Sequence, residues 1–195
     1  MLKKLLVMAL GLALLSTAGI SATYDIDTAH SDVGFSIRHL GVSKTRGQFN
    51  DVKGMIKWSG EKDLAAAHIE GHVIVKSIDT GNAKRDAHLI GADFFEANKH
   101  PHMTFTSKRF YKKRGQLYVS GDLMIHGITR RVDAPIEVLG PVNDPWGNEK
   151  LGMEVEFEIN RKDYGLNWNK KLDQGGLLIG EKVEVEISVE AGARK

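Results

Sequence analysis

The sequence predicts an all-β fold: an antiparallel sheet of eight or more strands closed into a barrel, with one or two short helices inserted midway. Two observations support this prediction. Apolar and polar residues alternate with a period of two along most of the chain, and turns rich in Gly, Asn and Asp separate the alternating runs. No Pro- or Gly-rich linker divides these runs, so we expect one domain.

The alternation is clearest at residues 183–190, where valine and isoleucine form one face of the strand and mostly glutamate forms the other. Residues 153–159 repeat this pattern. The other expected strands lie at 33–37, 71–78, 103–107, 117–125 and 132–138. A sandwich has a filled core, whereas an eight-stranded barrel has no open edge and can hold one small ligand. A transmembrane barrel fits poorly, because aromatic residues make up only 7% of the chain and the polar faces carry dense glutamate.

One stretch in the middle of the chain departs from the period of two. Asn82 can cap a helix that runs through "AKRDAHLIG" and ends at Gly91. Asp93 can cap a further turn through "FFEAN", before Pro101 separates this stretch from the next strand. The sequence therefore predicts one or two short helices between strands.

The first 22 residues have the layout of a secretory signal peptide: two lysines, the apolar run Leu5–Leu15 and a segment of small residues. A membrane anchor needs roughly 20 apolar residues, and this run is shorter. We expect cleavage after Ala22 or Ala18. Residues 23–195 then form the mature domain, soluble in the periplasm and without a membrane-spanning segment.

The composition of the chain excludes several classes of function. There is no cysteine, and therefore no disulfide, no thiolate metal ligand and no lipid-attachment cysteine. The formal charge of +2 comes from the two lysines of the signal peptide, which leaves the mature domain with a net charge of zero. Because nucleic-acid binding needs an excess of basic surface, we expect no nucleic-acid partner.

Eight histidines make a metal site arithmetically feasible, and the tightest pairs are His68 with His72 and His100 with His102. A four-residue offset on a strand separates two side chains by about 13 Å, which is too far for one ion. Pro101 argues against a regular strand between the other two histidines. A partner histidine on a neighbouring strand is still an alternative for His68 or His72. We expect no metal and no other cofactor.

Residues 77–89, "SIDTGNAKRDAHL", concentrate polar side chains around the expected helix. Arg85, Asp86 and His88 could form a structural network at a helix end. The alternative is a polar mouth over an apolar interior, and it gains weight because Phe94 and Phe95 follow directly. The inward strand faces would supply that interior, although the same residues would fit an ordinary packed core equally well. They are Phe35, Ile37, Val73, Val75, Phe105, Leu123, Ile125, Val155, Phe157 and Ile159.

Several motifs in order resemble the YceI-like family of small exported bacterial proteins. They are "YDIDTAHSDVGFSIRHLGVSKTRGQF", "SIDTGNAKRDAHLIGADFFEANKHPHMTFTS", "GDLMIHGITRRV" and "INRKDYGLNWNKKLDQGGLLIGEKVEVEISVE", and together they cover essentially all of the mature chain. The resemblance implies an extended lipocalin-like barrel that holds one long apolar chain, such as a polyisoprenoid or an isoprenoid quinone, and often a homodimer. It implies no metal and no established catalytic residues.

By position, the resemblance assigns the polar mouth to Asn82, Arg85, Asp86 and His88. It also implies six further cavity residues, which are Leu89, Phe94, Phe95, Tyr164, Leu166 and Trp168. We therefore expect a protein that transports or stores a long apolar lipid. Two alternatives stay open: an enzyme acting on an isoprenoid lipid with His88 as base and Asp86 as its orienting partner, and a structural module with a solid core.

Overall fold

The computed structural model describes residues 21–173 and 175–195. Its strands are β1 (Ala22–Ile26), β2 (Asp32–His39), β3 (Ser43–Phe49), β4 (Val52–Trp58), β5 (His68–Ile74), β6 (Ile78–Asp79), β7 (His102–Lys113), β8 (Gln116–Ile125), β9 (Ile128–Asn143), β10 (Glu149–Asn160) and β11 (Ile179–Ala193). Its helices are α1 (Ala83–Leu89) and the 3₁₀ helices η1 (Thr28–His30), η2 (Val75–Ser77) and η3 (Arg161–Tyr164). Within these ranges no helix is long and apolar enough to cross a membrane. The predicted signal peptide falls almost entirely on residues 1–20, outside the described residues.

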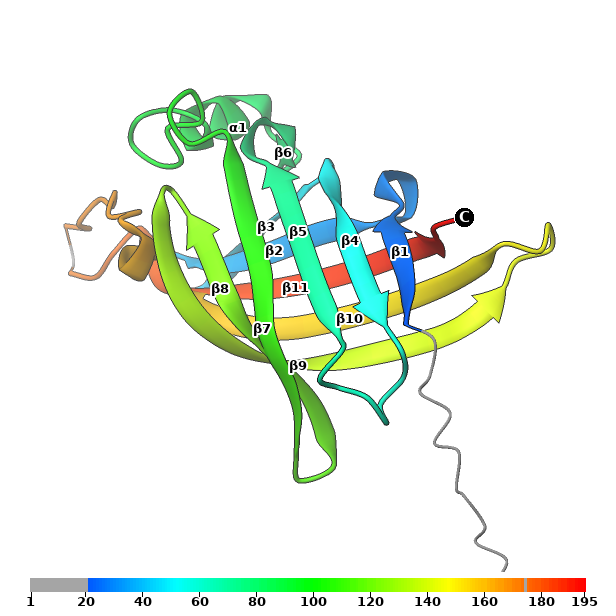
Figure 1. Cartoon of the computed structure of the whole chain (residues 1–195). Helices are drawn as coiled ribbons and strands as arrows, with labels where there is room; N and C mark the ends of the chain where they lie inside the picture. The colour runs from blue at the N-terminus through cyan, green and yellow to red at the C-terminus, as the bar shows by residue number, and fades with distance from the viewer. Residues whose placement is uncertain (1–20, 174) are drawn as a thin grey trace, which may run out of the picture.

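The sheet closes on itself, which confirms the predicted antiparallel barrel (Figure 1). Eight strands form the ring in the order β1-β4-β5-β7-β8-β9-β10-β11, and the C-terminal end of β11 pairs with β1. The preceding part of β11 pairs with β2 instead, and β3 and β6 follow β2 in the sheet. The same strand therefore closes the ring and carries the additional strands.

The pairing register explains the period of two in the sequence. Val155 lies opposite Ile187 and Phe157 lies opposite Val185, so apolar residues of β10 and β11 share the inner face. The alternate residues of both strands are mostly glutamates, and they are exposed on the outer face. A shift of one residue would turn every one of these side chains to the wrong face, so the pattern fixes the register.

The structure corrects two local expectations. Residues 75–77 form η2, so the strand expected at 71–78 ends at Ile74. Residues 93–98 form turns and not a second helix, because Glu96 has a φ of +45°, in the left-handed region that a right-handed helix cannot contain. The sheet has eleven strands, in agreement with the eight or more that were expected, because β2, β3 and β6 extend the eight-stranded ring.

Buried apolar residues form two clusters at opposite ends of the barrel. The closed-end cluster consists of Tyr24, Ile56, Trp58, Ala67, Phe110, Leu117, Val119, Ala134, Ile136, Leu151, Met153, Val189 and Ala191. The mouth cluster consists of Phe49, Val75, Ile78, Ala97, Met103, Ile125, Tyr164 and Leu166. Strand β8 shows the separation, because Leu117 near its start belongs to the first cluster and Ile125 at its end belongs to the second.

Helix α1 lies over the end of the barrel that carries the mouth cluster, beside β6 and the ends of β5 and β7 (Figure 1). The helix has seven residues and begins after Asn82, as the sequence predicts. The Asn82 side chain accepts hydrogen bonds from the backbone N–H groups of Lys84 and Arg85, both at 3.1 Å. These bonds satisfy two donors that have no partner within the helix.

Replacing Asn82 with alanine should lower the free energy of unfolding by about 1 kcal/mol, because it removes this cap. Asn82→Asp keeps a side-chain oxygen at the same position, so its free energy of unfolding should stay close to that of the wild-type protein. Urea denaturation of both variants and the wild-type protein measures the difference. Equal midpoints for the alanine variant and the wild type would show that the cap does not stabilise the fold.

Candidate functional site

A cavity of about 410 Å³ lies inside the barrel and reaches both buried clusters. Every described strand except β6 contributes to its wall, and most of the lining side chains are apolar. On β10 the wall runs from Met153 to Ile159, six residue steps or about 20 Å of strand. The volume falls in the range of about 300–1,000 Å³ that is usual for small-molecule sites.

The cavity opens to solvent at the α1 end. Arg85 and His88 line its wall and are also exposed on the protein surface. At the other end, Tyr24 and Trp58 of the closed-end cluster are 2% and 5% exposed, so the barrel is filled there. The cavity is therefore a pocket with an entrance near α1.

Most of the side chains proposed from the sequence lie in the wall of this cavity. Arg85 and His88 are the polar ones. The apolar ones are Phe35, Ile37, Val73, Leu89, Phe94, Phe95, Phe105, Leu123, Ile125, Val155, Phe157, Ile159, Leu166 and Trp168. The structure thus brings together residues from α1, from the loop after it, from the strands and from the segment after η3.

Four of the proposed residues lie outside the wall. Val75 and Tyr164 are buried in the mouth cluster, where burial raises the pKa of the Tyr164 hydroxyl. Asn82 caps α1. Asp86 accepts hydrogen bonds from the backbone N–H of Thr80 at 3.0 Å and from its hydroxyl at 2.5 Å. The last two therefore hold the helix against the preceding turn, which is the structural network left open by the sequence.

Three rings form the entrance of the cavity. The imidazole of His88 lies 5.0 Å from both the Phe94 and the Trp168 ring centroids, edge-on to each, and these two rings are 5.1 Å apart. His88 Nε2 is also 2.8 Å from a carboxylate oxygen of Asp93. The edge-to-face arrangement is a favourable way for aromatic rings to pack, so the three side chains stabilise one another. The entrance is therefore aromatic, with one polar edge directed at solvent.

Arg161 is the buried charged group of the wall. It is 3% exposed and begins η3 directly after β10. Its Nε donates to the backbone carbonyl of Gly180 at 2.8 Å and its Nη1 donates to that of Leu166. Its Nη2 is buried and has no hydrogen-bond partner. The two carbonyl contacts therefore hold the guanidinium in place while one of its nitrogens stays free.

Arg161 places a positive charge in the wall of the apolar cavity. Burial lowers the pKa of the guanidinium, and the Glu181 carboxylate opposes that effect. Arginine stays charged in proteins at neutral pH. Glu181 itself pairs with the Lys162 ammonium, so it only partly compensates the Arg161 charge. A charged donor inside an apolar pocket favours a ligand that brings an oxygen acceptor to it.

The sequence analysis missed Arg161, although a signal for it was present. The inward positions of β10 are odd-numbered, from Met153 through Ile159, and position 161 continues that series. Charged residues are rarely buried without a partner, so the residue was passed over in favour of its aromatic neighbours. Val183, Val185 and Ile187 of β11 are further wall residues that were not named as candidates.

The chain is similar to known proteins over nearly its whole length. Residues 24–191 match the YceI-like domain. Protein YceI of Shigella flexneri is 36% identical over 187 residues, which cover 94% of each chain. Burkholderia cenocepacia BcnA has a similar fold, with a TM-score of 0.73 and 22% identity over 85% of this chain and 99% of that one.

A second solved structure with the same fold is a polyisoprenoid binding domain from Saccharophagus degradans. It has a TM-score of 0.67 and 17% identity, and the match covers 89% of this chain and 99% of that domain. The domain match and the identity to the Shigella protein are sufficient to assign the family. This chain belongs to the YceI-like family.

Proposed function

We propose that this protein holds one long apolar lipid, an isoprenoid chain, inside its barrel for transport or storage. The observation that carries the proposal is the apolar cavity with an entrance at Arg85 and His88. A chain inside it would contact side chains from nearly every strand and would be shielded from water. The binding of a polyisoprenoid by a domain of the same fold supports this choice of ligand class.

The length of the apolar chain would set its affinity. Ligands of this size realise about 0.3 kcal/mol per heavy atom, so a 20-carbon chain yields about 6 kcal/mol, a dissociation constant of tens of micromolar. A chain of 40 carbons at the same efficiency yields about 12 kcal/mol, near nanomolar. Long chains would stay bound and short ones would exchange.

The predicted signal peptide fits this role. A lipid with a long apolar tail does not cross an aqueous compartment without a protein that covers the tail, because exposure of apolar surface to water is unfavourable. An exported carrier would supply that cover in the periplasm.

Filling the cavity from inside should abolish binding. Val155 lies in the wall, and the adjacent Glu154 is exposed on the outer face. Val155→Trp should weaken binding of a 40-carbon prenyl alcohol to the delipidated protein at least about tenfold. Glu154→Trp adds the same side chain outside the barrel and should bind as the wild type does. Native mass spectrometry and titration calorimetry measure both variants.

The results of this test separate the alternatives. Equal loss of binding in both variants would place the lipid outside the barrel. A wild-type protein that binds no prenyl chain of any length would contradict the proposed function and would leave the solid structural module as the better account.

Arg161 should orient the lipid within the pocket. Its free Nη2 can donate to an oxygen of the head group, and its charge favours an anionic oxygen most. With one common tail, the wild-type protein should bind a prenyl phosphate about tenfold more tightly than the prenyl alcohol or the hydrocarbon. Arg161→Met should reduce this preference to near unity.

The control for this experiment is Lys170→Met, which removes a nearby exposed positive charge and leaves the Lys162–Glu181 pair intact. It should keep the preference for phosphate. Circular dichroism checks that Arg161→Met still folds without its contacts to Gly180 and Leu166. If the wild-type protein binds the three ligands equally, Arg161 has only a structural role, and this result does not depend on the variant.

A further inference from the structure

Three potential metal ligands meet beside the mouth of the barrel. Glu96 and His100 come from the loop after α1, and His126 comes from the turn between β8 and β9. One ligand atom of each lies within 4.8 Å of the others, and all three residues are partly buried. The imidazole rings of His100 and His126 are edge-on, with centroids 4.5 Å apart. No pattern in the sequence indicated this cluster, because His126 lies 26 residues after His100 along the chain.

The backbone that holds these side chains together adopts an unfavourable conformation at two non-glycine residues. His126 and Gly127 form a two-residue hairpin turn, with φ values of +52° and +74°. Such turns favour Asn, Asp and Gly, and histidine is unusual in them. Glu96 is also in the left-handed region, with φ +45°. Residues held in this region without being glycine often mark functional sites.

The contacts around the cluster leave its ligand atoms available. His126 Nε2 is buried and has no hydrogen-bond partner. A Cβ atom on Gly127 would lie 2.8 Å from His100 Cε1, so the glycine leaves room for the His100 ring. Glu96 Oε1 is 2.6 Å from the Lys99 ammonium, whose side chain is 71% exposed and free to move into solvent.

We propose that Glu96, His100 and His126 bind a divalent transition-metal ion of the Zn²⁺ class. Two imidazoles and one carboxylate form a ligand set that Zn²⁺ prefers, with water at the fourth position. Neighbouring ligand atoms in a tetrahedral zinc site are about 3.4 Å apart, so the present spacing must close by up to about 1.4 Å. Rotation of the Glu96 side chain away from Lys99 would bring its carboxylate toward the rings. The ion would join the β8–β9 turn to the loop that follows the entrance residues.

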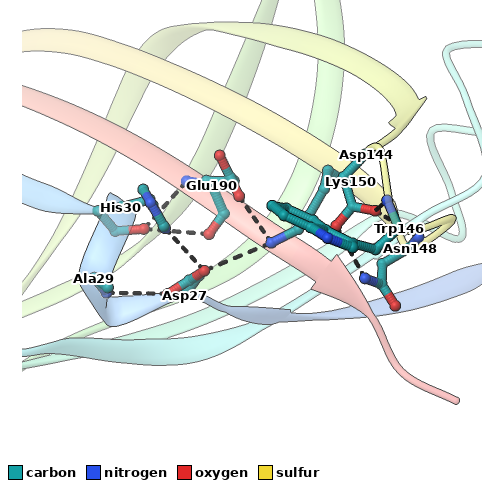
Figure 2. Close-up of polar contacts among 9 residues, drawn as sticks. Asp27, Ala29, His30, Asp144, Trp146, Asn148, Lys150 and Glu190 are labelled. Atoms are coloured by element: carbon teal, nitrogen blue, oxygen red, sulfur yellow. Dashed lines mark hydrogen bonds and ion pairs between the residues drawn. The ribbon is translucent and has the colours of Figure 1, made fainter.

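A second cluster of similar composition serves as the comparison. Asp27, His30 and Glu190 also place three ligand atoms within 4.8 Å of one another. Figure 2 shows that the Lys150 ammonium reaches this cluster, at 2.8 Å from Glu190 and 3.5 Å from Asp27. His30 is 3.0 Å from Asp27 in the same network. A lysine thus supplies the positive charge there, and we expect no metal ion at this cluster.

The test is titration of the mature protein, without a histidine tag and after treatment with a chelator, with Zn²⁺ and with Co²⁺. We expect one Zn²⁺ per chain with a dissociation constant at or below micromolar. Saturating Zn²⁺ should raise the melting temperature by about 5 °C or more. Bound Co²⁺ should give the visible absorption of a tetrahedral site. These readouts do not depend on any lipid.

Matched variants locate the ion. Glu96→Gln and His126→Asn should each weaken Zn²⁺ binding at least about tenfold, and asparagine suits the left-handed turn, so the fold should be kept. His30→Ala, in the comparison cluster, should bind as the wild type does. A wild-type protein with no one-to-one Zn²⁺ binding would overturn the proposal. Loss of binding in His30→Ala together with retention in Glu96→Gln would overturn it as well.

Discussion

The pairing of β11 with three other strands is the constraint on which the rest of the structure depends. One edge of β11 pairs with β10 along its length, and the other edge pairs first with β2 and then with β1. This arrangement closes the ring, so each of the eight ring strands has a hydrogen-bonded neighbour on both sides. An interior with almost no polar groups becomes tolerable only under that condition. The apolar pocket is therefore a consequence of closure.

Closing the ring does not by itself leave room for a pocket inside the barrel. Two glycines contribute to that room. A Cβ atom on Gly121 would lie 2.4 Å from the Phe105 ring, and one on Gly47 would lie 2.6 Å from the Phe35 ring. Both rings therefore lie flat over bare backbone on the barrel wall. With larger residues at these positions, the rings would have to move toward the barrel axis. The volume available to a ligand therefore depends on each of these phenylalanine rings packing against a glycine, which has no side chain.

The sequence predicted the strands well where one face is apolar and the other charged. β10 and β11 are of this kind, and their register follows directly from the pattern. The segments that form β1, β3, β4 and β6 were not identified as strands. In β3, for example, "SKTRGQF" at 43–49 alternates weakly. Val75 was placed on an inward face because nothing in its neighbours signals the 3₁₀ turn that ends the strand at Ile74. The local sequence pattern therefore predicts which face of a strand each side chain lies on. It fails where the backbone leaves the strand conformation.

The site was harder to predict than the fold, for a physical reason. The composition of an inward face is the same for a packed core and for a pocket, since the difference lies in how the rings and glycines of different strands fit together. The Glu96, His100 and His126 cluster is hidden for a related reason, because the β8–β9 turn meets the loop after α1 only in the folded barrel. Within the short motif around Asn82, Asn82 and Asp86 have local roles, whereas Arg85 and His88 lie in the cavity wall.

The two ends of the barrel differ in a way that gives the pocket a direction. At the closed end, Tyr24 is 2% exposed and donates to Glu149 at 2.6 Å, and burial together with this bond raises the pKa of Tyr24 to about 12. Large side chains fill that end, and opening it would expose them to water. At the α1 end, the wall includes exposed His88 and the buried guanidinium of Arg161. An apolar tail gains most by entering from α1 and extending toward Tyr24, because its polar group then remains where the pocket has its donors. Under the proposed function, the asymmetry of the barrel would thus set the orientation of a bound lipid.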